Sequence, residues 1–162
     1  MGEEIFPLVD DEGKVIGKAS RSVCHSGSKL LHPVIHLHIF NSGGKLFLQK
    51  RSSTKDIQPD MWDTSVAGHV NWGETPEDAL QREAKEELGI EEIAPAFMKK
   101  YIVETDIEKE LSYCYCIDHQ EVVDGRFWKI EEIKSNIGKN VFTVNFESDF
   151  KTIIEDTTRV QK

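Results

Sequence analysis

Residues 68–90 read GHVNWGETPEDALQREAKEELGI, and this stretch predicts a loop followed by a well-marked helix. Thr75 is a favourable N-cap residue, and Pro76 suits the first helical turn because its missing N–H would have no partner there. Asp78 completes an approximate capping box with Thr75. Gly89 can adopt the left-handed conformation that ends a helix. The sequence therefore predicts a helix that begins near Pro76 and stops at Gly89.

Three glutamates of this helix occupy unusual positions. At about 100° per residue, three apolar residues share one side of the helix: Leu80, Ala84 and Leu88. Glu83 and Glu87 fall beside that apolar stripe, and Glu86 lies one turn from Glu83. Carboxylates at this spacing repel one another and are costly to bury without positive charge. The helix therefore presents either a solvated acidic face or oxygen ligands for a hard divalent cation.

The spacing of these residues resembles the signature of a known enzyme family. Gly68 is followed after five residues by Glu74 and, after seven more, by REAKEELGI at residues 82–90. This pattern is similar to the signature box of the Nudix hydrolases, with only Ala84 smaller than the usual bulky aliphatic residue. The resemblance implies an α/β fold, the Nudix α/β/α sandwich around a mixed sheet. It also implies that Arg82 orients the helix glutamates through a salt bridge.

The composition limits the class of protein. A chain of 162 residues is long enough to bury its own core, which favours a single Nudix hydrolase domain over residues 1–162. The net charge of −9 argues against a nucleic-acid or membrane-surface binder, because phosphates would be repelled. No signal-peptide pattern or long apolar run is present, and the three cysteines suit reduced thiols. We therefore expect a cytoplasmic protein.

Alternating apolar residues predict strands on both sides of the helix. Strands are predicted at residues 5–9, 15–17, 33–40, 45–51, 62–70, 96–104, 111–117 and 125–128. Two further helices are predicted at residues 130–137 and 147–156. In the strand at 33–40, His36 and His38 fall on the polar face, opposite the isoleucines. Cys114 and Cys116 are interpreted as small buried residues of a strand.

A second set of residues resembles one branch of the same superfamily. The landmarks are His25, His32-Pro33, Phe40-Asn41, Lys50-Arg51, Lys55, Pro59, Trp62 and Gly68-His69. Their order is similar to that of isopentenyl diphosphate isomerase, a Nudix-fold enzyme, over roughly residues 5–118. The resemblance implies that five residues bind a metal: His25, His32, His69, Glu108 and Glu110. Such a mixed N/O set suits zinc, manganese or iron, although a histidine taken singly is more often a hydrogen-bonded structural residue than a metal ligand.

The same resemblance indicates where the substrate phosphates would bind. Arg51 and Lys55 match diphosphate-contacting positions of the isomerases, and a guanidinium fork and an ammonium group both suit phosphate. The plainer interpretation is that both are solvated surface cations. Trp62 and Trp72 would either line a pocket or pack against the core.

Ala67 separates two possible reactions. The isomerases place a catalytic cysteine immediately before the Gly-His pair, where this chain has Ala67. A methyl group cannot exchange a proton with an alkene. The box of the isomerases is also degenerate, whereas this chain keeps all three helix glutamates, and a full carboxylate set suits Mg²⁺ and hydrolysis. The sequence therefore favours a hydrolase within the isomerase-like branch.

We therefore expect a Nudix pyrophosphohydrolase that cleaves a small-molecule diphosphate, either a nucleoside diphosphate derivative or a related organic diphosphate. Glu83, Glu86 and Glu87 would hold Mg²⁺ or Mn²⁺ near the Gly68 carbonyl, and one of them or Glu110 would act as the catalytic base. A second metal, Zn²⁺, Mn²⁺ or Fe²⁺, would occupy the His/Glu set. Three alternatives stay open: an isomerase without the usual cysteine, a non-catalytic nucleotide-binding sensor, and a purely structural metal. Whether a homodimer completes the pocket also stays open.

Overall fold

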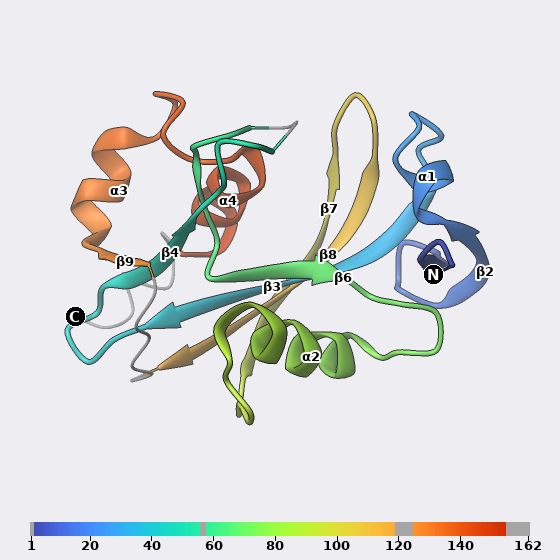
Figure 1. Cartoon of the computed structure of the whole chain (residues 1–162), viewed down its shortest axis with the longest axis horizontal. Helices are drawn as coiled ribbons and strands as arrows, with labels where there is room; N and C mark the ends of the chain where they lie inside the picture. Colours follow the sequence, from blue (N-terminus) through green and yellow to red (C-terminus); the bar gives the residue numbers. More distant parts are fainter. Residues whose placement is uncertain (1, 56–57, 119–124, 155–162) are drawn as a thin grey trace.

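The structure is a computed structural model that describes residues 2–55, 58–118 and 125–154. These residues form a seven-stranded mixed sheet and a separate two-stranded sheet (Figure 1). The large sheet contains β3 (Leu31–Phe40), β4 (Leu46–Lys50), β5 (Trp62–Asp63), β6 (Val66–His69), β7 (Ala96–Glu104), β8 (Lys109–Asp118) and β9 (Arg126–Trp128). The small sheet pairs β1 (Ile5–Val9) with β2 (Val15–Ser20). The helices are α1 (Arg21–Cys24), α2 (Pro76–Leu88), α3 (Ile130–Asn136) and α4 (Val144–Asp149), which continues as a π-helical turn at Phe150–Ile154.

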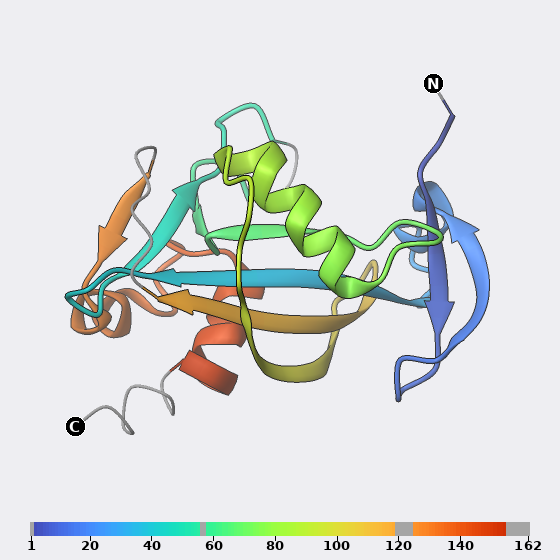
Figure 2. The ribbon, with the colours of Figure 1, turned by 90° about the horizontal axis from the view of Figure 1, so that it is seen from below.

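The large sheet lies between two layers of helix. Its strand order is β5-β4-β3-β8-β7, with β6 paired to β3 and β9 to β4; β3 and β8 are parallel, and the other pairs are antiparallel. Helix α2 crosses one face, whereas α3 and α4 lie on the other side (Figures 1 and 2). This arrangement is the α/β/α sandwich predicted from the sequence.

Two apolar clusters hold the layers together. On the α2 face, Ile35, Leu37 and Ile39 of β3 pack with Leu80 and Ala84 of the helix. The second cluster joins β4 and β9 to the C-terminal helices and contains Leu46, Leu48, Trp128, Ile133, Phe146 and Phe150. Burying side chains of this size stabilises a fold by roughly 1.5–3 kcal/mol each. The two clusters therefore fix the positions of α2 and α4 on opposite faces.

The central strand β3 is more buried than its alternating sequence predicts. All ten of its residues pair with β8, and only Phe40 is not fully buried. The histidine face does not meet solvent: His36 is 3% and His38 0% exposed. Asp149 at the end of α4 lies against both rings. The two histidines do lie on the face opposite the isoleucines, as predicted, but α4 covers that face and buries them.

The single strand predicted at residues 62–70 is divided into β5 and β6. The break comes at Thr64 and Ser65, which are both buried. The Ser65 hydroxyl accepts a hydrogen bond from the Ile39 N–H at 2.9 Å and donates one to the Phe47 carbonyl at 2.7 Å. It thereby bridges β3 and β4, which separate after the single pair between Phe40 and Leu46. The chain then leaves β4 and continues along β3 as β6.

Helix α2 begins and ends where the sequence predicts. The Thr75 side chain accepts the Asp78 N–H at 3.1 Å, and the Asp78 carboxylate accepts the Thr75 N–H at 3.0 Å. Gly89 adopts the left-handed conformation with φ of 68°. Among the described residues, no helix has the length and apolar character needed to cross a membrane.

The last helix differs from its predicted bounds of 147–156. It begins at Val144 because the Thr143 hydroxyl accepts the Phe146 N–H at 3.2 Å and caps the helix. Residues 155 and 156 lie outside the described residues. The remaining predicted strands and the helix at 130–137 are present with small shifts at their ends.

Replacing Thr75 with alanine removes the side-chain oxygen that caps α2. We expect Thr75→Ala to lower the free energy of unfolding by about 1 kcal/mol, measured by urea denaturation. Thr75→Ser keeps the oxygen and should retain most of the stability. Equal losses in the two variants would contradict a capping role for the hydroxyl.

Candidate active site and metal centre

A pocket of about 1030 Å³ gathers nearly all the predicted site residues. Helix α2, strands β3, β6 and β8, and the segment after β4 all contribute to its lining. The predicted residues that line it are His25, Arg51, Lys55, Gly68, His69, Glu83, Glu86, Glu87, Glu108 and Glu110. His32 is fully buried. The fold thus brings together residues that are up to 85 positions apart in the sequence (110 − 25).

Arg82 organises the α2 side of the pocket. Its Nε donates to Glu74 Oε1 at 2.8 Å, and its Nη1 donates to Glu83 Oε1 at 2.7 Å. The Nη2 group donates to the His69 carbonyl at 3.0 Å. The hydrogen bond from Arg82 to Glu74 holds the pKa of that carboxyl below its ordinary value. The salt bridge predicted for Arg82 is therefore present, and it ties α2 to the preceding loop and to β6.

Gly68 lets β6 approach the helix closely. A Cβ atom at this position would overlap the Glu83 carboxylate. Only glycine can therefore keep Glu83 beside the backbone of β6. The geometry explains why a glycine stands at the first position of the box.

The three helix glutamates have different environments. Glu83 is largely buried and bonded to Arg82, whereas the Glu86 side chain is 59% exposed and lies 3.5 Å from Arg82 Nη1. Glu87 is exposed as a residue, but its carboxylate accepts a hydrogen bond from Gln49 Nε2 at 3.0 Å. Burial of this carboxylate, followed by the charge of Glu83, raises the pKa of Glu87 to about 7. A cation would relieve the cost of placing these carboxylates together.

The helix glutamates do not form a compact cluster in this structure. Among the described residues, the groups whose ligand atoms all lie within 4.8 Å of one another belong either to the His/Glu set or to a cluster around Asp149. None of these groups contains a glutamate of α2. Arg82 pairs with Glu83 and Glu86, whereas the Glu87 carboxylate accepts a hydrogen bond from Gln49. Mg²⁺ keeps several waters and needs only a few carboxylates, so this looser arrangement suits it.

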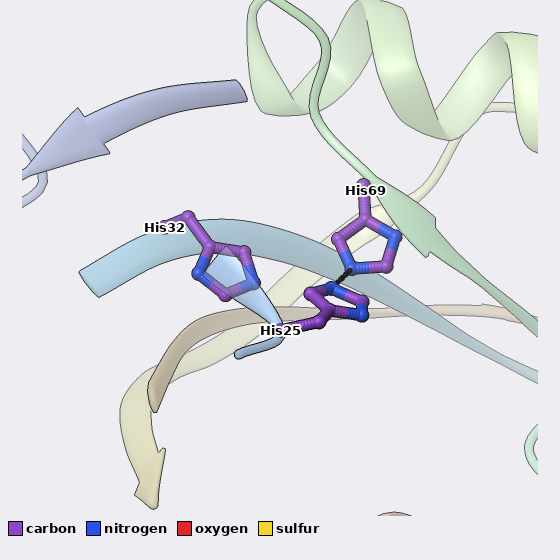
Figure 3. Close-up of side chains that lie close together, drawn as sticks. All are labelled: His25, His32 and His69. Atoms are coloured by element: carbon purple, nitrogen blue, oxygen red, sulfur yellow. Dashed lines mark hydrogen bonds between the residues drawn. The ribbon is translucent and has the colours of Figure 1, made fainter. Parts of the chain in front are cut away.

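Three histidine rings from separate parts of the chain lie close together (Figure 3). His25 follows α1, His32 lies on β3 and His69 ends β6. The Nε2 atoms of His25 and His69 are 3.1 Å apart, and ligand atoms of all three rings lie within 4.8 Å of one another. Phe6 stacks in parallel against His69 with ring centroids 4.4 Å apart, which holds that ring in place.

His32 provides the test of whether a metal fits. Its Nδ1 lies 2.9 Å from the Leu30 carbonyl and therefore donates a proton to it, which leaves Nε2 with a lone pair. That Nε2 is buried and has no hydrogen-bond partner among the described residues. Burial lowers the pKa of His32, and it lowers the pKa of His69 to about 2. The rings are therefore neutral, as metal ligands must be, and an orphaned nitrogen is available.

Two glutamates complete the predicted His/Glu set. Glu108 lies in the turn between β7 and β8, and Glu110 lies on β8. Ligand atoms of His32, Glu108 and Glu110 lie within 4.8 Å of one another. His25 Nε2 is 3.5 Å from Glu108 Oε2, and His69 Nε2 is 3.9 Å from Glu110 Oε1. Burial, followed by the charge of Glu108, raises the pKa of Glu110 to about 7. The predicted mixed N/O set is therefore assembled by the fold.

The predicted phosphate-binding residues line the pocket, whereas the two tryptophans do not. Arg51 and Lys55 line the pocket, and Arg51 Nη1 lies 3.4 Å from Asp63 Oδ2. Trp62 packs edge-on against Trp128 with ring centroids 5.3 Å apart. Trp72 is 48% exposed, and Lys18 Nζ lies 5.1 Å above its ring. Neither tryptophan lines the pocket, so both are packing or surface residues.

Two residues beside the pocket, His36 and Asp149, were not predicted from the sequence as site residues. His36 lines it, and its Nδ1 lies 2.7 Å from Oδ2 of the fully buried Asp149. The available signal was the position of Asp149 between Phe146 and Phe150 on the apolar side of a helix. A carboxylate there needs a buried partner.

Comparison with known proteins gives one family match and several relatives. The family model described as the NUDIX domain matches residues 30–145. An uncharacterized Nudix hydrolase of Nostoc sp. is 38% identical over 123 residues, covering 66% of this chain and 73% of that protein. An isopentenyl-diphosphate Delta-isomerase of Mycolicibacterium vanbaalenii is 34% identical over 87 residues, covering 54% of this chain. That alignment covers 48% of the isomerase, so this chain matches about half of its length.

Solved structures agree with this match. The crystal structure of DR0079 from Deinococcus radiodurans superposes with a TM-score of 0.64 at 26% sequence identity. The superposition covers 86% of this chain and 92% of that chain.

The raised pKa of Glu110 predicts how stability depends on pH. The folded protein binds this proton with a pKa of about 7, whereas the ordinary value is 4.5. Without metal, stability should therefore fall as the pH rises from about 4.5 to about 7. We expect Glu110→Gln to be more stable than wild type at pH 8 by on the order of 2 kcal/mol, measured by denaturation in a chelator.

The exposed Glu131 supplies a matched control, and Glu131→Gln should leave the stability at pH 8 unchanged. The advantage of Glu110→Gln should shrink below pH 4.5. An advantage that stayed constant from pH 4 to pH 8 would show that the charge of Glu110 is not its cause.

Proposed function

This chain belongs to the NUDIX domain family, and from that membership we propose that it is a metal-dependent pyrophosphohydrolase. Its substrate is a nucleoside diphosphate derivative or a related organic diphosphate. The observation that carries the proposal is the shared pocket: the glutamates of α2, the basic residues after β4 and the His/Glu set all line it. A diphosphate needs cations along one side and a base near the phosphorus, and the pocket offers residues suited to both tasks.

Glu83, Glu86 and Glu87 are the residues that would hold Mg²⁺ or Mn²⁺, next to Gly68. When bound, such an ion neutralises phosphate oxygens and assists the activation of water. Arg82 keeps Glu83 in place through its 2.7 Å hydrogen bond. Arg51 and Lys55 would contact the phosphate oxygens, because both are cations that line the same pocket.

Glu110 or a helix glutamate would be the base. The attacking water gives its proton to the carboxylate, its oxygen bonds to phosphorus, and the bond from phosphorus to the leaving oxygen breaks. A general base works best when its pKa lies near the working pH, and the pKa values of Glu87 and Glu110 are both about 7. Glu110 is also almost fully buried, which limits competition from bulk water.

The His/Glu set would hold a second metal ion, Zn²⁺, Mn²⁺ or Fe²⁺. Support comes from the orphaned Nε2 of His32 and from the neutral state of the rings. Neutral imidazoles with carboxylates suit borderline first-row metals. Because His25, His69 and Glu110 also line the substrate pocket, this ion would lie beside the bound diphosphate.

The isomerase alternative has one observation in its favour, the similarity to isopentenyl-diphosphate Delta-isomerases. The pocket lining argues against a cysteine-based isomerase. Ala67 lines the pocket, whereas Cys24, Cys114 and Cys116 do not. Burial raises the pKa of all three thiols, which keeps them protonated. Hydrolysis is therefore the reaction that this site supports better.

Turnover tests the catalytic assignment. We expect wild type to release phosphate-containing products from a panel of nucleoside diphosphate derivatives in the presence of Mg²⁺ or Mn²⁺. Glu87→Gln should lower kcat by about a hundredfold, because one carboxylate of the set is lost. The exposed Glu91 follows the same helix, and Glu91→Gln should behave like wild type.

Equal activity of Glu87→Gln and wild type would contradict the metal assignment. Incubation with isopentenyl diphosphate in D₂O tests the alternative reaction. Incorporation of deuterium into the product without phosphate release would show that the protein is an isomerase and not a hydrolase.

Metal analysis tests the second site. We expect purified protein loaded with Zn²⁺ or Mn²⁺ and desalted to lose about one equivalent of metal in His69→Ala, because one ligand of the His/Glu set is removed. His119 lies outside the described residues and has no predicted role, so His119→Ala serves as the control. Retention of the full metal content in His69→Ala would rule out this set as the second site.

A further inference from the structure

His36 lies on the floor of the pocket, outside both proposed metal sites. In the sheet it stands directly opposite Ala67 of β6 and Cys114 of β8. His36 and Ala67 both line the pocket, whereas Cys114 does not. Because the side chain of Ala67 is a single methyl group, no bulky neighbour on β6 covers the imidazole. The ring is therefore within reach of a ligand in the pocket even though it is only 3% exposed.

Asp149 fixes the orientation of this ring from the far side. Its Oδ2 lies 2.7 Å from His36 Nδ1, and both side chains are buried. Burial alone would lower the pKa of His36, but the adjacent carboxylate outweighs it and raises the pKa well above the ordinary value. The close carboxylate therefore favours the protonated form of the buried His36 ring.

The surroundings of Asp149 indicate a hydrogen-bonded network and not a metal site. His36, Cys114 and Asp149 have ligand atoms within 4.8 Å of one another. However, the 2.7 Å between His36 and Asp149 is shorter than the ~3.3 Å between two N/O ligands on one tetrahedral zinc ion. Tyr101 already donates to Oδ1 of Asp149, and His38 Nε2 lies 3.1 Å from Oδ2. Both oxygens are thus engaged.

A bound diphosphate would meet many carboxylates in this pocket. Glu83, Glu86, Glu87, Glu108 and Glu110 all line it. Two of the arginines that line it already pair with carboxylates, Arg82 with Glu74 and Glu83, and Arg51 with Asp63. A charged donor on the floor would supply a further favourable contact, and such hydrogen bonds are strong where water is excluded.

We propose that His36 is a substrate-contacting residue that donates a hydrogen bond to an oxygen of the diphosphate, and that Asp149 is the positioning residue that orients it. This inference rests on the proposed diphosphate substrate. Its probe is methylene diphosphonate with Mg²⁺, which mimics a diphosphate but cannot be hydrolysed, so binding is measured independently of turnover.

Calorimetry of wild type and His36→Gln gives the main comparison. Loss of a charged hydrogen bond should weaken methylene diphosphonate binding about ten- to a hundredfold. His38→Gln is the matched control, because His38 contacts the same carboxylate but does not line the pocket. Its affinity should stay within about twofold of wild type, and equal losses in the two variants would overturn the proposal.

The positioning role of Asp149 is tested by binding measurements that a purely structural role would not change in the same way. Asp149→Asn should weaken methylene diphosphonate binding by nearly the same factor as His36→Gln, and the double variant should be no weaker than either. The affinity for Mn²⁺ alone should be unchanged. A parallel loss of Mn²⁺ affinity, or additive effects in the double variant, would contradict a positioning role.

Ala67→Val keeps the proposal testable if Asp149→Asn does not fold. A β-branched side chain suits a strand and would cover the imidazole, so binding of the probe should weaken about tenfold while the Asp149 network stays intact. Unchanged affinity in both Ala67→Val and His36→Gln would overturn the inference.

These results also separate the inference from the proposed function. His36-dependent binding without turnover of any diphosphate would support the contact and reject the hydrolase. Turnover by wild type with unaltered probe affinity in His36→Gln would support the hydrolase and reject the contact. Failure of wild type to bind the probe would reject the contact, whereas the hydrolase would be rejected only by the absence of turnover.

Discussion

The hydrogen bonds of Arg82 are the interaction on which the pocket depends. One guanidinium reaches Glu74 in the loop, Glu83 on its own helix and the carbonyl of His69 on β6. Without this positive group, the glutamates of α2 would repel one another beside the sheet. The planar guanidinium of Arg82 also holds α2 close to β6. Gly68 permits this close approach, because a Cβ atom at that position would overlap the Glu83 side chain. Helix, loop and strand are therefore coupled through one side chain.

The face of β3 opposite α2 carries a row of polar side chains that serves two purposes. At one end, His32 lies beside Glu110 in the sheet register and belongs to the His/Glu set. Further along, His36 is bonded to Asp149 under α4. A row of this kind is costly to bury, so each member needs a partner. For His36 the partner is a carboxylate, and for the buried Nε2 of His32 a metal ion is the natural candidate.

Ala67 marks a difference between this chain and the isomerases that it resembles. The chain is similar to members of that group in sequence, yet the position before the Gly-His pair is Ala67. A methyl group cannot transfer a proton, and it leaves the imidazole of His36 uncovered from the side of β6. The helix keeps all three glutamates. Function therefore follows from the residues placed around the pocket, since one fold hosts several reactions.

Local signals in the sequence determined the parts of this protein that depend on neighbours in the chain. Thr75, Asp78 and Gly89 specify the ends of α2, and the box spacing identifies the family. These features were predictable because caps, turns and periodicity act over a few residues. The His/Glu residues were also named in advance, but only through a resemblance.

Only the tertiary structure decided what lies across those elements. It divided residues 62–70 into two strands, because Ser65 bridges β3 and β4. It placed Asp149 against His36, 113 residues away, and so buried a histidine of the polar strand face beside a carboxylate. It also showed that Arg82 draws two of the three helix glutamates to itself. Such contacts join distant segments, and their free energy depends on burial and geometry that no local pattern of residues contains.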